Sequence, residues 1–450
     1  MNDEGSSRPN EPLVEDRLGR RARVFGSERA ILAGIDPGSG GSADIEASMR
    51  ELESLAETAG IPTVATVLQK RNRPDPATFL GKGKIEEIRR AADELEADVV
   101  IFNHELSPAQ ARNLENALSR KAIDRTQLIM DIFAQRAATK EAKLQVELAQ
   151  LRYLLPRLRG WGAALTRTGG GIGTRGPGET QLELDRFKVN RRIHALERRL
   201  KKTLAERSVR RKRRAKSDLP QIALVGYTNS GKSTLLNRLC MAGAAVEDRL
   251  FATLDTMVRR AEIAPGRKAL FVDTVGFIRN LPHDLVPAFA ATLEAVRHAD
   301  LILHVIDRAG STWEEDQRVV LEILEHEIFE AEDDRPQTVN VLNKIDAVPS
   351  DTSDGAQGVA ISAKDGTNVQ QLLALVAETL FPDDRTVSLL VPFSATGTLH
   401  RWTTPERVEV LEHTESGVRV RARVSRDELQ RLRAAGVEVS ASGASPALPR

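Results

Sequence analysis

Two glycines, a lysine and a serine between Gly226 and Ser233 have the spacing of a phosphate-binding loop. The segment reads GYTNSGKS, which fits the pattern GxxxxGK(S/T). Glycine lets the backbone of such a loop curl so that its amides point at phosphates, while the lysine reaches the β- and γ-phosphates and the serine hydroxyl ligates Mg²⁺. The apolar run IALVG precedes the loop and STLLNRL follows it, which gives the expected strand and helix. We therefore predict a nucleotide site, against the alternative of an ordinary glycine turn.

A second short motif indicates the base. Residues 343–346 read NKID, which is the NKxD form, and they follow the strand-like run TVNVL. The carboxylate of Asp346 can accept hydrogen bonds from N1–H and the 2-amino group of guanine, whereas adenine would leave the carboxylate unpaired at a cost in free energy. The run ISAK at 361–364 is expected to add backbone contacts to the base. The sequence thus predicts GTP and GDP as the ligands.

Two further motifs lie between these and indicate a switchable metal site. FVDTVG places Asp273 at the end of a buried strand, where it can hold Mg²⁺ through water, and Gly276 where its amide can reach the γ-phosphate. LFATLDT contains Thr253, a candidate second Mg²⁺ ligand in a switch segment. Phe277 follows Gly276, where Ras-type enzymes have a glutamine that orients water. Since phenylalanine cannot do this, we expect slow intrinsic hydrolysis and a catalytic group supplied by another loop or a partner.

The predicted site therefore combines three overlapping groups of residues. The catalytic group is Lys232, Thr253 and Gly276, and the metal ligands are Ser233, Thr253 and Asp273. The residues expected to contact the nucleotide are Gly226, Tyr227, Thr228, Asn229, Ser230, Gly231, Lys232, Ser233, Thr234, Phe251, Ala252, Thr253, Leu254, Asp255, Asp273, Thr274, Val275, Gly276, Asn343, Lys344, Ile345, Asp346, Ser362, Ala363 and Lys364.

A glycine-rich segment, Gly169–Gly178, lies between two long helical patterns. In each pattern, leucine and other aliphatic residues recur at spacings of three and four. Such stripes bury one seam against a partner, so the two helices are predicted to form an antiparallel hairpin with the glycines at its tip. The segment from Leu148 to Gly178 has no acidic residue. Its arginines suit RNA phosphates: Arg157, Arg159, Arg167 and Arg175. We rank three interpretations of this segment: an RNA-contacting tip first, a flexible connector second and a phosphate-binding loop last.

The elements that position these motifs alternate between strand and helix patterns over a chain of 450 residues. We predict an α/β protein with a P-loop GTPase domain of Ras-like mixed sheet. A small α/β domain and the helical hairpin precede that domain, and a small α+β domain follows it. The predicted boundaries are 1–27 disordered tail, 28–135 α/β domain, 136–217 hairpin, 218–384 GTP-binding domain, 385–438 C-terminal domain and 439–450 disordered tail.

Composition excludes several classes of protein. The net charge is only +1 and there is one cysteine, so neither an intrachain disulfide framework nor a cysteine metal site is expected. No apolar run is long enough for a membrane span, and no lipidation motif or secretory signal is present, so a cytoplasmic location is expected. FLGKGK, at 79–84, has glycines beside Lys82 and Lys84, which suits either phosphate binding or the start of a helix.

The chain resembles the HflX family of GTPases. The resemblance rests on GYTNSGKST, LFATLDT, DTVGFI, NKID and FLGKGK, and above all on GGGIGTRGPGETQLELDRF. It implies a cytoplasmic, monomeric GTPase whose N-terminal domain and hairpin contact the RNA of the large (50S) ribosomal subunit. GTP binding and hydrolysis would then be coupled to ribosome splitting or rescue under stress, with stimulation by the ribosome. The alternatives are an assembly or surveillance GTPase of the large subunit, or an RNA-binding or remodelling protein gated by GTP.

Overall fold

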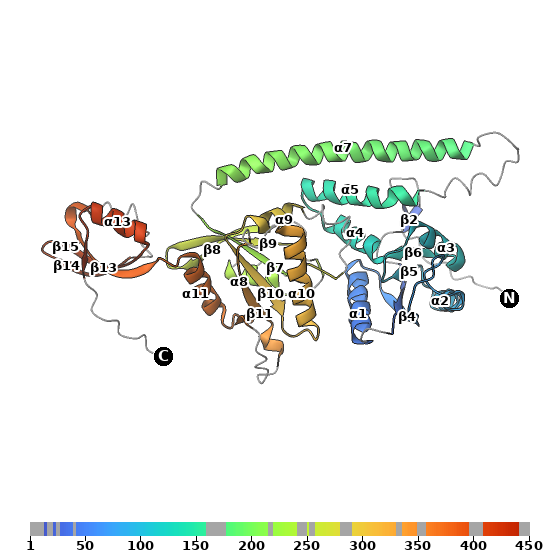
Figure 1. The fold of residues 1–450 in the computed structure, drawn as a ribbon, viewed down its shortest axis with the longest axis horizontal. Coiled ribbons are helices and arrows are strands. Elements are labelled where there is room, and N and C mark those ends of the chain that lie inside the picture. Colours follow the sequence, from blue (N-terminus) through green and yellow to red (C-terminus); the bar gives the residue numbers. More distant parts are fainter. Residues whose placement is uncertain are drawn as a thin grey trace, which may run out of the picture. The chain divides into compact units, whose positions relative to one another are not determined.

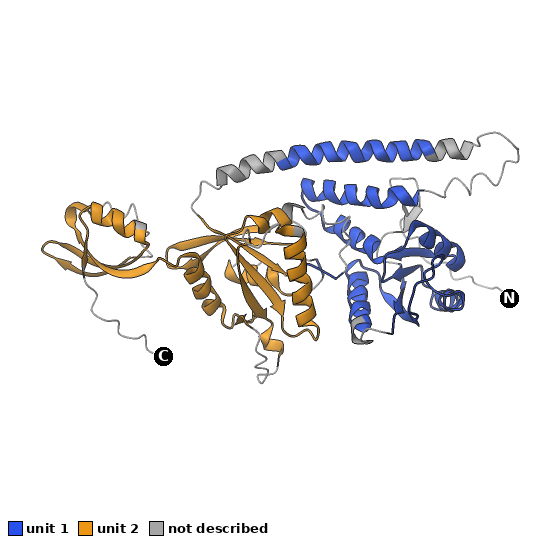
Figure 2. Cartoon of the chain, viewed as in Figure 1, with its two compact units in different colours: residues 1–216, 247–255, 275–291 blue, residues 217–246, 256–274, 292–450 orange. Residues whose placement is uncertain are grey.

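A computed structural model gives the fold, and Figure 2 divides it into two compact units. Unit 1 comprises residues 1–216, 247–255 and 275–291, and unit 2 comprises 217–246, 256–274 and 292–450. The structure describes residues 13–15, 21–23, 28–38, 42–158, 177–214, 219–240, 250–251, 257–279, 290–329, 335–348, 357–395 and 408–440. Within these ranges, no helix is both long and apolar enough to span a membrane.

Unit 1 contains a four-stranded parallel sheet with the strand order β4-β3-β5-β6 (Figure 1). Nearly every residue of β3 is buried, as expected for a parallel strand covered by helices on both faces. The strands are β3 (Ala30–Asp36), β4 (Thr63–Lys70), β5 (Val99–Phe102) and β6 (Lys121–Asp124). The helices are α1 (Ser42–Thr58), α2 (Lys82–Glu94), α3 (Pro108–Leu118) and α4 (Arg125–Arg136).

Local sequence explains where these helices begin. Ser107 caps α3 through a capping box with Gln110, and Pro108 occupies the first turn, where its missing amide hydrogen costs nothing. The carboxylate of Asp124 caps α4 by accepting from the Gln127 amide. In FLGKGK, helix α2 begins at Lys82, so this motif forms the start of a helix.

The helical hairpin of unit 1 pairs α5 (Lys140–Arg157) with α7 (Pro177–Arg214), side by side and antiparallel in Figure 1. The predicted stripes form its core, which contains Leu144, Leu148, Ile193 and Leu196, with Leu151, Leu155, Val189 and Leu200 packed against it. Arg152 pairs with Glu197 at 2.8 Å and Arg192 with Glu147 at 2.6 Å, across the two helices. Because these pairs are partly exposed, the apolar seam contributes most of the pairing energy.

Unit 2 contains the P-loop GTPase fold, a six-stranded mixed sheet with the order β12-β11-β10-β7-β9-β8. Only β8 runs antiparallel to its neighbour. The strands are β7 (Gln221–Gly226), β8 (Met257–Ala264), β9 (Arg267–Asp273), β10 (Leu301–Asp307), β11 (Gln337–Asn343) and β12 (Val359–Ala360). The helices are α8 (Lys232–Leu239), α9 (Ala290–Arg297), α10 (Trp313–Ile323) and α11 (Val369–Leu380).

A second sheet in unit 2 is antiparallel and has the order β14-β15-β13-β16. Its elements are β13 (Arg385–Pro392), β14 (Val408–Thr414), β15 (Gly417–Val424), α13 (Arg426–Ala434) and β16 (Glu438–Ser440). This is the small α+β domain that the sequence predicts. Arg267 of β9 forms ion pairs with Asp384 and with Glu428 of α13, which tie the end of α11 and this domain to the larger sheet.

The structure differs from the predicted tails in two places. Strand β1 (Leu13–Glu15) pairs with β2 (Arg21–Arg23) inside the segment predicted to be disordered. Strand β16 extends to Ser440, beyond the predicted start of the terminal tail, because Val439 pairs with Leu389 at the edge of β13. In both places the backbone hydrogen bonds of a partner strand, which composition does not reveal, order a short segment.

Candidate guanine-nucleotide site

The loop between β7 and α8 has the backbone geometry of a phosphate-binding loop. Gly231 has a φ of +91°, and a Cβ atom there would lie 2.2 Å from the side-chain nitrogen of Asn343. At Gly226 a Cβ atom would lie 2.2 Å from the carbonyl oxygen of Val305 in β10. Both glycines are therefore sterically required, because a side chain at either position would meet these atoms.

Lys232 lies across the loop that precedes it. Its ammonium donates to the carbonyl oxygens of Gly226 at 3.1 Å and Tyr227 at 2.7 Å, and the residue is 6% exposed. Burial lowers the pKa of Lys232 to about 8; nearby Asp273 opposes this shift and Lys344 adds to it. The side chain is thus a buried cation at the mouth of the loop, the arrangement needed to neutralise phosphate charge.

The predicted metal ligands Ser233 and Asp273 meet at the ends of α8 and β9. The hydroxyl of Ser233 donates to a carboxylate oxygen of Asp273 at 2.7 Å. Asp273 is fully buried, and the neighbouring Thr274 is fixed by a 2.6 Å hydrogen bond from its hydroxyl to the carbonyl oxygen of Leu224. A hydroxyl and a carboxylate are the hard oxygen ligands that Mg²⁺ prefers, so these residues fit that ion.

The base-binding motifs are joined to the phosphate loop through Asn343. Its amide donates to the carbonyl oxygen of Ser230 at 2.8 Å and its oxygen accepts from the Ala363 amide at 2.9 Å. The buried Ser362 donates its hydroxyl to Asp346 at 2.7 Å, which orients that exposed carboxylate. The structure thus brings NKID, ISAK and the P-loop together in unit 2, as the motif order predicts.

Two residues that the sequence interpretation missed hold this arrangement. Asp307, at the end of β10, accepts from the ammonium of Lys344 at 2.7 Å, and Lys344 has a φ of +65°. Arg238 of α8 donates to the carbonyl oxygens of Ala363 and Lys364. Asp307 was findable, because an aspartate at the end of a central parallel strand lies at the ligand edge of the sheet. The contacts of Arg238 could not be predicted from the sequence, because they depend on how α8 packs against a loop more than 120 residues away.

The described parts of the two predicted switch segments, Phe251 and residues 275–279, group by their contacts with unit 1 rather than unit 2. Phe251 was predicted to contact the nucleotide, but its side chain packs against Phe133 of α4, with ring centroids 4.7 Å apart and nearly perpendicular planes. Its ring is therefore a packing group. Gly276 is buried, and the next residue, Phe277, is 5% exposed. The residues predicted at 252–255, including Thr253, lie outside the described residues.

Of the four arginines predicted to contact RNA, Arg157 lies among the described residues. Arg157 differs from the prediction, because its guanidinium donates to the carbonyl oxygen of Leu106 at 2.7 Å, pairs with Asp124 at 3.4 Å and stacks on the ring of Tyr153. These contacts join α5 to the parallel sheet, so Arg157 has a structural role that its neighbours in sequence could not reveal. Arg159, Arg167, Arg175 and nearly all of the glycine-rich tip lie outside the described residues.

Comparisons with known proteins agree with this geometry. The chain matches three family models, described as GTP-binding GTPase N-terminal over 46–134, GTP-binding GTPase Middle Region over 136–214 and 50S ribosome-binding GTPase over 221–344. A protein named GTPase HflX from Caldanaerobacter subterraneus is 46% identical, with 90% of this chain and 93% of that protein covered. The chain belongs to the HflX family of GTPases. GTPase HflX from Escherichia coli is 47% identical over 74% of this chain and 79% of that protein.

Among solved structures, a GTP-binding protein from Sulfolobus solfataricus in complex with GDP matches 78% of this chain and 98% of its own, with 25% identity and a TM-score of 0.43. As a member of the HflX family, the chain is a GTP hydrolase that binds GTP and GDP. The roles of individual residues remain predictions, and the buried lysine gives the first test.

We predict that GTP binding to this HflX-family chain weakens as the pH rises above about 8. With its pKa lowered to about 8, Lys232 is largely neutral above that pH in the free protein, while phosphates restore its charge, so binding takes up a proton. The Kd of GTP should therefore rise by up to about tenfold for each pH unit until the pKa of the bound state is reached. Calorimetry in two buffers of different ionisation enthalpy measures the uptake directly.

The matched control for this prediction is Lys268→Gln, which removes an exposed lysine from β9 of the same sheet. This variant should keep both the pH dependence and the proton uptake of the unaltered protein. A Kd that stays constant from pH 7 to pH 9.5 would show that Lys232 titrates outside this range.

Proposed function

We propose that this protein is a cytoplasmic GTPase that binds the large (50S) ribosomal subunit and couples its nucleotide state to ribosome splitting or rescue. The observation that carries the proposal is the basic helix α7, which belongs to the same chain as a guanine-nucleotide site. From 183 to 204, its side chains include eight basic residues and three acidic ones. A basic helix supports binding to RNA through the charge of its phosphates. The matching family model is described as "50S ribosome-binding GTPase", which supports the large ribosomal subunit as the partner that carries this RNA.

We propose Mg²⁺ as the cofactor, held by Ser233 and Asp273 with Thr253 as a further ligand in the GTP state. The ion would neutralise charge on the β- and γ-phosphates. Lys232 would add a second positive charge beside the phosphates. Gly276 would present its amide to the γ-phosphate, and the segment that follows would respond when this phosphate is lost.

Intrinsic hydrolysis should be slow, because Phe277 cannot orient water and is 5% exposed. The missing group is supplied by another loop or by the ribosome, which would make the ribosome a stimulator of turnover. This feature separates an enzyme that acts on ribosomes from a GTPase that needs no partner.

The test is GTP turnover with and without purified 50S subunits, run beside sedimentation of 70S ribosomes with the protein and a non-hydrolysable GTP analogue. We expect strong stimulation by 50S and conversion of 70S ribosomes to free subunits. Stimulation without splitting would favour the assembly or surveillance role instead. If 50S has no effect while free ribosomal RNA stimulates, the GTP-gated RNA-binding role replaces it, and no response to either removes the ribosome from the proposal.

A further inference from the structure

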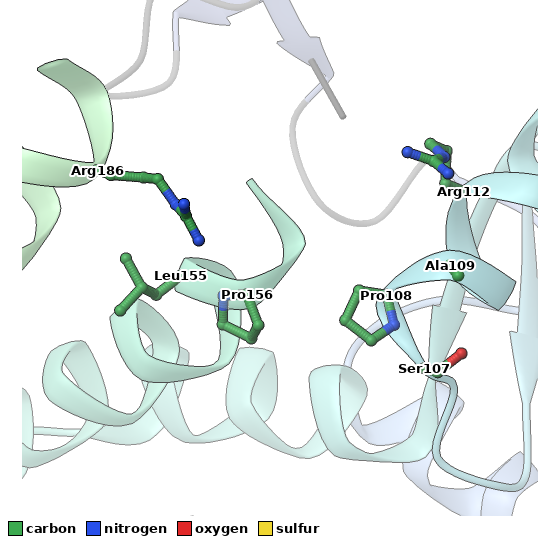
Figure 3. Close-up of a pocket in the computed structure, with 7 residues that line it drawn as sticks. All are labelled: Ser107, Pro108, Ala109, Arg112, Leu155, Pro156 and Arg186. Atoms are coloured by element: carbon green, nitrogen blue, oxygen red, sulfur yellow. The ribbon is translucent and has the colours of Figure 1, made fainter. Parts of the chain in front are cut away.

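A cleft of about 690 Å³ lies in unit 1, between the start of α3, the end of α5 and the first part of α7. Its volume lies within the roughly 300–1,000 Å³ of small-molecule sites. Figure 3 shows Arg186 reaching from α7 toward the end of α5, with Arg112 and the start of α3 on the other side. Among the described residues, the cleft is lined by Ser107, Pro108, Ala109, Arg112, Leu155, Pro156 and Arg186.

The lining combines an apolar surface with two cations. Pro108 and Ala109 come from α3, while Leu155 and Pro156 come from the last turn of α5, so flat or small apolar groups form two sides. Arg186 is half-buried and makes no hydrogen bond or ion pair within the described part of the chain. With Arg112 it places two guanidinium groups at the cleft, which suits an anionic ligand.

The surface beside the cleft has matching chemistry. Phe187 follows Arg186 in the sequence and is 66% exposed, and Leu184 is 53% exposed three residues earlier, on the same side of α7. The helix continues with basic side chains that are exposed to solvent: Lys188, Arg191, Arg192, Arg198, Arg199, Lys201 and Lys202. An exposed aromatic ring within a basic surface is the combination with which proteins hold unpaired bases and their phosphates.

We propose that this cleft binds one unstacked nucleotide of single-stranded RNA. The base would lie between Pro108 on one side and Leu155 and Pro156 on the other, and the phosphate would lie between Arg112 and Arg186. This inference rests on the proposed ribosomal function and narrows it, because it assigns an RNA site to the helix residues that flank the glycine-rich segment in sequence rather than to that segment itself. Phe187 would stack on a neighbouring base.

The observations favour RNA over a peptide for two reasons. The two arginines and the basic surface of α7 suit the regular negative charge of a nucleic-acid strand, while an apolar cleft alone would suit either partner. Single-stranded loops also present flat bases that can leave the stack and enter a cleft with apolar side chains. A duplex cannot place a base there, so an extruded or looped nucleotide is the form recognised.

Three full-length variants test the site. Arg112→Glu combined with Arg186→Glu reverses both charges, and Ala109→Leu fills the cleft from an exposed position of α3 without changing charge. Arg90→Glu is the matched control, because Arg90 is an exposed arginine on α2 of the same unit. Binding is measured to purified 50S subunits and to a labelled single-stranded RNA of about twelve nucleotides, at several salt concentrations. Circular dichroism and GTP turnover without ribosomes check that each variant is folded.

We expect the charge-reversal pair and Ala109→Leu each to weaken binding to both probes by roughly 10- to 100-fold, as for the loss of one stacked base. The charge reversal alone should reduce the slope of log K against log salt by about 0.7 for each phosphate that the protein no longer neutralises. Unaltered protein that binds no 50S would overturn the proposed function. If the unaltered protein binds 50S and both test variants bind it equally tightly, only the proposed RNA cleft is overturned. Weakened 50S binding with unchanged binding to the RNA oligonucleotide would mean that a ribosomal protein occupies the cleft, which also contradicts the inference.

Discussion

Replacing Asp346 by asparagine is expected to move the base preference of the site from guanine to xanthine. In the structure, the Asp346 carboxylate is oriented by the hydroxyl of Ser362 at 2.7 Å. An asparagine amide donates where the carboxylate accepts, so it faces the 2-amino group of guanine with a second donor and suits the 2-oxo group of xanthine. Two hydrogen bonds to a charged acceptor are lost, which should weaken GTP binding by about 10²- to 10⁴-fold.

The measurement for Asp346→Asn is the Kd of GTP and XTP, with turnover of each at saturation. XTP should bind the variant better than GTP does, and turnover at saturating XTP should approach that of the unaltered enzyme on GTP, because the phosphate loop is unchanged. The matched control is Asp365→Asn in the neighbouring loop, where the carboxylate accepts from Thr367. The control should keep its preference for guanine. Retained guanine selectivity in Asp346→Asn would disprove the assignment of the base-binding carboxylate.

The nucleotide site was predictable because its parts are local in sequence. Each motif follows a strand of one mainly parallel sheet, and the carboxyl ends of such strands meet at one edge. Strand patterns therefore place GYTNSGKS, DTVG and NKID near each other without knowledge of a single long-range contact. The glycines at 226 and 231 were the most useful residues for predicting the phosphate loop, since their positions leave no room for a side chain.

The parts that sequence did not reveal depend on contacts between distant segments. Arg157 looked like a free cation of the hairpin, but it pairs with Asp124 and with a carbonyl group 51 positions away. Phe251 lies in a nucleotide motif, but its ring packs on Phe133. The cleft with Arg186 exists only because the ends of α3, α5 and α7 meet. In each place, the sequence gives the chemistry of a side chain, while the pairing of elements decides what that side chain contacts.

One such contact gives the second large prediction, at Arg125 on the first turn of α4. This arginine is 3% exposed; it pairs with Glu51 at 2.6 Å and donates to the side chain of Asn103 at 3.2 Å. It also donates to the carbonyl oxygen of Arg279, at 3.3 Å, in the segment that follows Gly276. Arg125→Met removes the buried cation that faces the partly buried Glu51, which should cost up to about 3 kcal/mol of local stability in unit 1.

Because a chain of two compact units is not expected to unfold in a single two-state transition, the loss of stability in Arg125→Met is measured by amide hydrogen exchange in α4 and β6. The double variant Arg125→Met with Glu51→Leu should recover most of it, since replacing both partners removes the buried charge. Arg89→Met, which breaks an exposed pair with Glu86 on α2, is the control and should leave exchange in α4 unchanged.

The contact between Arg125 and the carbonyl group of Arg279 predicts a second effect that stability alone would not produce. Phe133 and Arg125 both belong to α4 and contact the segments that contain Phe251 and Arg279, so this helix holds both predicted switch regions. Loss of one hydrogen bond from a charged donor should loosen the segment after Gly276 and weaken the binding of a non-hydrolysable GTP analogue roughly tenfold in Arg125→Met, while GDP, which lacks the γ-phosphate, should bind as before. Glu51→Gln weakens the pair with Arg125 but keeps the donor to Arg279, so it should raise exchange in α4 with little change in binding of the analogue. Equal weakening of analogue binding in both variants would show that α4 acts on the nucleotide site only through the stability of unit 1.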